Sequence, residues 1–109
     1  MTSSISSASP SALLCLSVPV ALDDEIADFL RSHSALISGF TSVSANGMGP
    51  NSIFGSVMEQ VQGKSRRQLF MSEAPIAQID SVLTLLNDNY RGADIHFWVT
   101  PVLKSGSLR

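Results

Sequence analysis

The sequence predicts an α+β domain of the ferredoxin-like class, with the order strand, helix, strand, strand, helix, strand. Short apolar runs alternate with two segments whose apolar residues recur every three or four positions, the spacing of amphipathic helices. Breakers, among them Pro19, Gly39 and Gly92, separate these segments. Two right-handed crossovers in this order produce a four-stranded antiparallel sheet with both helices on one face.

The first half of the chain contributes two strands and one helix. The apolar run 12–18 is closed by Pro19, a pattern typical of a strand covered on both faces. Three acidic residues at 23–25 favour a helix start, and apolar residues follow at helical spacing: Leu22, Ile26, Phe29 and Leu30. We expect this helix to end near His33. The run 36–43, interrupted by Gly39, predicts the second strand.

The second half repeats the pattern in the order strand, helix, strand. Residues 66–72 predict a strand, and Pro75 suits the first turn of the helix that follows. An apolar stripe continues this helix to about Asn89, formed by Ile76, Ile79, Val82, Leu83 and Leu86. Residues 93–103 predict the fourth strand. Because apolar residues fall on both faces of the strands, we expect other subunits to cover the face without helices.

The two segments outside this pattern are the start of the chain and a long insertion. Residues 1–11 are Ser-rich and read as a disordered leader, which leaves 12–109 as a single domain. Residues 44–63 separate the second and third strands, and a connection of this length in a small domain favours a functional role. Its apolar residues fall at helix-like intervals, so a short amphipathic helix there could dock a partner or pack on a neighbouring subunit.

Composition narrows the classes of function. Seven basic and nine acidic side chains give a net charge of −2, which argues against nucleic acid and anionic membranes as partners. The apolar run 12–22 has no basic residue before it, so it is predicted to be a buried strand and not a secretory signal, and no stretch is long enough to span a membrane. The single cysteine, Cys15, suits a reducing compartment, and we expect a cytoplasmic protein. Apolar residues at 44% with charged residues at 15% also favour self-association.

Three short blocks carry a resemblance to a known superfamily. The block 39–49 is similar to the passage from the second strand into the flexible T-loop of PII proteins, with Gly39, Thr41, Gly47 and Gly49 in matching places. The block 64–70 is similar to the basic start of the third strand, and 97–102 to the closing strand. The chain therefore resembles the PII-like superfamily, which contains nitrogen-signalling PII proteins and CutA-type metal-tolerance proteins. It is most similar to a small branch often encoded beside heavy-metal efflux pumps.

The resemblance implies a homotrimeric regulatory protein with ligand clefts between subunits and a loop that signals to a protein partner, such as a membrane transporter. The cleft would take a small anionic ligand such as a nucleotide, since Arg and Lys side chains bind carboxylate and phosphate groups. The candidate ligand-binding residues are Gly39, Thr41, Gly47, Gly49, Lys64, Arg66, Arg67, Arg91, Gly92 and Lys104. The alternative for the basic residues is a charged strand edge that discourages aggregation.

Departures from the PII pattern keep other readings open. Residues 50–52 replace the basic and amide residues that follow in PII proteins, and His96 stands where a phosphate-binding lysine is expected. A CutA-like divalent-metal protein is the alternative function, with His96 as its weak candidate ligand, although no group of residues has a recognised metal spacing. A constitutive interaction module is a third reading. No motif places a base beside Cys15 or a serine, so we expect no enzymatic activity.

Overall fold

The computed structural model describes residues 11–48 and 65–108. In chain order the elements are β1 (Ser11–Pro19), the short 3-10 helix η1 (Val20–Leu22), α1 (Asp23–Ser32), β2 (Thr41–Gly47), β3 (Ser65–Pro75), α3 (Ile76–Tyr90) and β4 (His96–Pro101). This is the predicted order of strands and helices. The leader 1–10 and most of the insertion, including its predicted short helix, lie outside the described residues.

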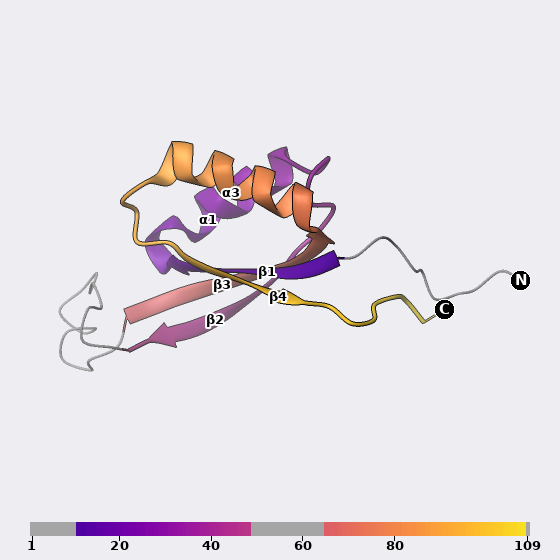
Figure 1. Cartoon of the computed structure of the whole chain (residues 1–109). Helices are drawn as coiled ribbons and strands as arrows, with labels where there is room; N and C mark the ends of the chain where they lie inside the picture. Colours follow the sequence, from indigo (N-terminus) through magenta and orange to yellow (C-terminus); the bar gives the residue numbers. More distant parts are fainter. Residues whose placement is uncertain (1–10, 49–64, 109) are drawn as a thin grey trace, which may run out of the picture.

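The four strands form one antiparallel sheet in the order β2-β3-β1-β4, which confirms the ferredoxin-like class. The central strand β1 pairs on one side with β3 and on the other with β4, so that Cys15 lies between Met71 and Trp98. Both helices cover the same face of this sheet (Figure 1). The strands β2 and β4 are left as its two edges.

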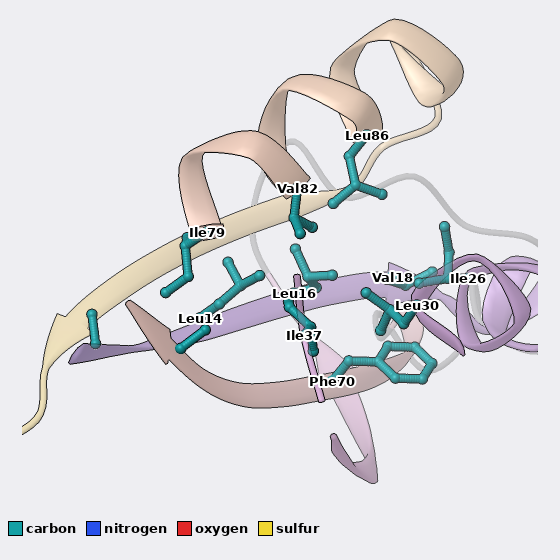
Figure 2. Packing of buried hydrophobic residues seen from close by; sticks show 12 residues of the cluster. Leu14, Leu16, Val18, Ile26, Leu30, Ile37, Phe70, Ile79, Val82 and Leu86 are labelled. Atoms are coloured by element: carbon teal, nitrogen blue, oxygen red, sulfur yellow. The ribbon is translucent and has the colours of Figure 1, made fainter. Parts of the chain in front are cut away.

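The core lies between the helices and that covered face. Alternate residues of β1 are almost completely buried: Ala12, Leu14, Leu16 and Val18 are at most 1% exposed. The helices supply Ile26 and Leu30 from α1 and Ile79, Val82 and Leu86 from α3, and Figure 2 shows these side chains converging on the strands. The two-residue period of β1 therefore meets the helical stripes predicted from the sequence, because each places its apolar residues on one side.

Both ends of β2 differ from the predicted ones for physical reasons. The run 36–43 was expected to be a strand, but β2 begins at Thr41. Ile37 is buried in the core, but it closes a turn and does not belong to a strand. Its backbone N–H donates to the His33 carbonyl at 3.1 Å. The apolar residues before Thr41 looked like a strand because Ile37 is buried, although it pairs with no strand. Conversely, Ser44–Gly47 of the expected insertion extends β2, because β3 starts at Ser65 and gives these residues a pairing partner.

Further differences concern the ends of the remaining elements. Ser11, which the sequence placed in the leader, is the first residue of β1 and pairs with Pro75. Pro75 precedes α3 as its N-cap and does not belong to its first turn. β4 is shorter than predicted at both ends, and its start is delayed because Asp94 has a φ of 61°, which strand backbone cannot adopt.

The opposite face of the sheet, here called the open face, carries no helix. Its apolar residues come from all four strands and are Leu13, Cys15, Val43, Leu69, Met71 and Trp98. Val43 is 42% exposed and Trp98 is 44% exposed. That subunits cover this face stays a prediction. No helix in the described parts of the chain combines the length and the apolar character needed to cross a membrane.

Candidate functional site

Arg67 is the centre of the most connected polar cluster in the described structure. It is only 6% exposed, although arginine is rarely buried without partners. Its Nε donates to Ser17 Oγ at 2.9 Å, and Nη2 donates to the backbone oxygens of Ser17 and Asp94, both at 2.7 Å. Nη1 donates to Asp94 Oδ2 at 2.9 Å. These bonds use four of the five N–H donors of the guanidinium group.

Asp94 joins this cluster to a histidine. Its second carboxylate oxygen, Oδ1, lies 3.1 Å from Nε2 of His96, whose side chain is 71% exposed. The left-handed backbone of Asp94 is one that Asp tolerates better than most residues, and it turns the carboxylate back towards β3. We call Arg67, Ser17, Asp94 and His96 the Arg67 network. It links β3, β1 and the connection between α3 and β4.

The same arginine also meets the two strand ends that flank the insertion. Gly47, the last residue of β2, pairs with Ser65, the first residue of β3. A Cβ atom at Gly47 would lie 3.2 Å from Cγ and 3.3 Å from Cδ of Arg67, so glycine gives the arginine stem room to pass. Arg66, beside Arg67, pairs with Asn46 and is exposed. The root of the insertion is therefore packed against the Arg67 network.

The predicted site residues fall into separate groups in one protomer. Gly47, Arg66 and Arg67 lie at one end of the sheet, and Arg91 and Gly92 begin the connection that contains Asp94. Thr41 pairs with Met71, four residues along β3 from Arg67 and so about 13 Å away. The carbonyl of Gly39 accepts a hydrogen bond from the hydroxyl of Ser72, still further along that strand.

Lys104 is the most distant of the predicted residues. It follows Pro101, which pairs with Ala12 at one end of β1, whereas Arg67 pairs with Pro19 at the other end. Seven residues of strand separate these positions by about 23 Å, so within one protomer the two cations do not share a site. Gly49 and Lys64 lie outside the described residues.

Sequence reasoning missed Ser17 and Asp94. Ser17 was a recognisable signal, because it is a polar residue within an otherwise apolar buried strand, where it needs a hydrogen-bond partner. Asp94 follows Gly92 and Ala93 in the turn before β4, and Asp is one of the few residues that tolerate a positive φ there. Neither signal could name Arg67 as the partner.

Metal ligation and thiol reactivity depend on the grouping of ligands and on the environment of Cys15. Across the described ranges 11–48 and 65–108, no three His, Cys, Asp or Glu side chains are grouped as metal ligands would be. Cys15 is buried on the open face, and burial raises the pKa of its thiol, which disfavours the reactive thiolate. Arg66 and Arg67 place two positive side chains at the root of the insertion.

The sequence matches a protein-family model, and the fold matches solved structures of other proteins. A family model described as "Protein of unknown function (DUF3240)" matches residues 8–109. A DUF3240 family protein from Shewanella baltica superposes with a TM-score of 0.74 at 22% identity, covering 94% of this chain and 100% of that one. A comparison with curated proteins found no match.

Two other solved structures share the fold at lower identity. One is CPII from Thiomonas intermedia, a nitrogen regulatory PII-like protein bound to ADP, AMP and bicarbonate, with a TM-score of 0.68, 14% identity and coverage of 93% of this chain and 98% of that one. The other is CutA from Synechococcus elongatus complexed with Bis-Tris, with a TM-score of 0.70, 13% identity and coverage of 94% and 90%. Both matches concern the fold alone.

Proposed function

The chain belongs to the DUF3240 family and has the fold of PII-like and CutA proteins, and from this premise we propose that it is a trimeric, non-enzymatic regulatory protein of the cytoplasm. It binds a small anionic ligand, such as a nucleotide, in a cleft between subunits. Ligand binding changes the affinity of the 44–63 segment for a protein partner, such as a membrane transporter.

The observation that supports this proposal is the Arg67 network. Arg67 bonds Asp94 in the connection after α3 and packs its stem on Gly47 at the root of the insertion. A ligand held by Arg66 and Arg91 would lie near this cluster, and its affinity would differ between two arrangements of the insertion. That difference in affinity is what a population shift requires. Arg67 itself is assigned a positioning role, because its guanidinium is already bonded within the chain.

A trimer is supported by the open face. Val43 and Trp98 leave large apolar surfaces exposed on a face whose neighbours Leu13, Leu69 and Met71 are also apolar. Burying such a surface against other copies is favourable at about 25 cal/mol per Å². For Lys104 and Thr41 to share a site with the Arg67 network, they would have to come from a neighbouring subunit of this trimer, because within one subunit they lie far from Arg67. Light scattering should therefore give three times the monomer mass, and Trp98→Glu should lower it.

A divalent-metal protein of the CutA type is the second candidate. The observation in its favour is the exposed His96 beside the Asp94 carboxylate, since imidazole and carboxylate are common ligands of zinc and copper. One such pair per subunit is not a complete site. A metal would need ligands from a second copy.

A thermal-shift screen separates these candidates. ADP, AMP, ATP and bicarbonate are compared with zinc and copper, because a ligand that binds only the folded protein raises Tm by mass action. The regulatory proposal expects stabilisation by a nucleotide that Arg66→Gln weakens and Lys104→Gln also weakens, whereas Arg31→Gln leaves it unchanged. Stabilisation by metal alone, lost in His96→Ala, would replace it with the metal proposal. No response to any ligand would leave a constitutive interaction module.

A further inference from the structure

A cavity lies on the helix-covered side of the sheet and shares Asp94 with the Arg67 network. It has a volume of about 200 Å³ and is enclosed by the C-terminal half of α3, the 91–95 connection and the paired residues Leu16 and Phe97 of β1 and β4. Leu16 belongs to the helix-covered face, whereas Ser17, its neighbour, bonds Arg67 on the open face. We call this cavity the α3–β4 pocket.

The floor of the α3–β4 pocket is apolar. Helix α3 contributes Leu83, Leu86 and Tyr90, which recur at three and four residues and so share one side of the helix. Ile95 and Phe97 close the strand side. Phe97 remains 57% exposed, so a ligand in the pocket would cover apolar surface that the chain itself leaves in water.

The polar groups around this floor are unequally committed. The Asp94 carboxylate already bonds Arg67 and His96, and burial, followed by a hydrogen bond with Glu25, raises the pKa of the Tyr90 hydroxyl. Within the described residues, by contrast, no hydrogen bond or ion pair engages the Arg91 guanidinium or the Asn87 amide, and both line the pocket. Of the polar groups that line the pocket, the Arg91 cation and the Asn87 amide are therefore available to a ligand, whereas the Asp94 carboxylate is committed to Arg67 and His96.

The size of the cavity limits what can enter. It exceeds the about 150 Å³ that accommodates a benzene molecule in an engineered cavity, but it is smaller than the about 300 Å³ at which sites for larger ligands begin. A whole nucleotide would not fit. A six-membered ring or a branched aliphatic group fits, and the planar fork of Arg91 matches the two oxygens of a carboxylate.

We infer that the α3–β4 pocket is a binding site for small monocarboxylates with a compact apolar body, of the benzoate class, held by Arg91 at the rim and by Leu86 and Phe97 at the floor. This site shares Arg91 with the anion site of the proposed function, but its apolar floor lies on the helix-covered face, whereas Arg66 lies at the root of the insertion.

The test is an amide ¹H–¹⁵N NMR titration of the full chain with benzoate and, as the uncharged analogue, benzyl alcohol. We expect benzoate to shift the amides of Leu86, Tyr90, Ile95 and Phe97 with a Kd on the order of 1 mM, as the small number of ligand atoms allows. Benzyl alcohol should bind about tenfold more weakly, since it lacks the charge-assisted hydrogen bonds to Arg91.

Two substitutions at exposed positions test the location without disturbing the core. Asn87→Trp should block the pocket and abolish the benzoate shifts, whereas Asn89→Trp, two residues along α3 and outside the pocket, should leave them unchanged. Arg91→Gln should remove the preference for benzoate over benzyl alcohol. Asn87→Trp should also retain any nucleotide response, because Asn87 lines this pocket and is not a residue of the proposed regulatory site, so the two proposals can fail independently.

Three results would overturn the inference. These are the absence of localised shifts at about ten times the expected Kd, equal affinities for benzoate and benzyl alcohol in the native protein, and benzoate binding that survives Asn87→Trp.

Discussion

Replacing Arg67 by methionine tests whether the Arg67 network stabilises the fold. Methionine retains an unbranched stem that can pack on Gly47, but it removes every guanidinium hydrogen bond. The Asp94 carboxylate, 20% exposed, and the backbone oxygen of Ser17 then lose their partner. Breaking a buried ion pair from one side costs about 3–5 kcal/mol. Because Asp94 is partly exposed, we expect a loss of about 2–4 kcal/mol in the free energy of unfolding.

Urea unfolding measures this change, with protein concentration held constant because self-association contributes to apparent stability. Arg31→Met is the matched control, since it also removes one positive charge. The ion pair that it breaks is exposed, because the side chain of Arg31 is 65% exposed and that of its partner Asp28 is 78% exposed. We expect this control to cost less than about 1 kcal/mol. The double change with Asp94→Asn should show strong coupling. If Arg67→Met cost no more than Arg31→Met, the network would not stabilise the fold.

Four further predictions concern individual positions. Gly47→Ala should lower the free energy of unfolding by about 0.5–1 kcal/mol because its methyl group crowds the Arg67 stem, and adding Arg67→Ala should relieve this crowding. Gly39→Ala should cost nothing, because no other side chain or backbone comes within 4 Å of a Cβ atom there; urea unfolding of Gly47→Ala, the double variant and Gly39→Ala measures these differences. Gly92→Ala should cost about 1–2 kcal/mol because φ is +84°, and Gly92→Asn should cost less; a similar cost for both would contradict the backbone explanation. Hydrogen bonds from Ser105 and then Ser11 lower the pKa of Glu73, so these bonds add to the stability of the fold above the unfolded pKa, and this stability is lost as pH falls through the folded pKa. An NMR titration of Glu73 should show that Ser105→Ala raises this pKa more than Ser11→Ala does. Cys15 should react slowly with a thiol reagent in the native protein and rapidly in urea, and equal rates would show that the open face is accessible at that position.

Much of the architecture was predictable because it depends on local periodicity. The alternation of β1 and the helical spacing of Ile79, Val82 and Leu86 each place apolar side chains on one side, and the only compact arrangement of these faces is helices over a sheet. The errors occurred where apolar burial and backbone conformation disagree. Ile37 is as buried as a core strand residue, yet it lies in a turn.

The candidate site was predictable only in part. The basic cluster at Arg66 and Arg67 and the glycine at 47 were recognised from the chain, and the structure brings them together at the root of the insertion. The α3–β4 pocket was not anticipated, because its walls come from β1, α3 and β4, and none of the three carries a signal for a cavity.

The succession of strands and helices and the surplus of apolar residues on the strands are visible in the sequence, because both depend on the preferences of neighbouring residues. The partners of each charged residue, in contrast, depend on how the chain folds. Arg67 meets Ser17 and Asp94 across 50 and 27 residues of chain, and Lys104 is carried to the opposite end of the sheet. The physical reason is that strand pairing sets which distant residues become neighbours, and a buried guanidinium must bond whatever acceptors that pairing brings to it.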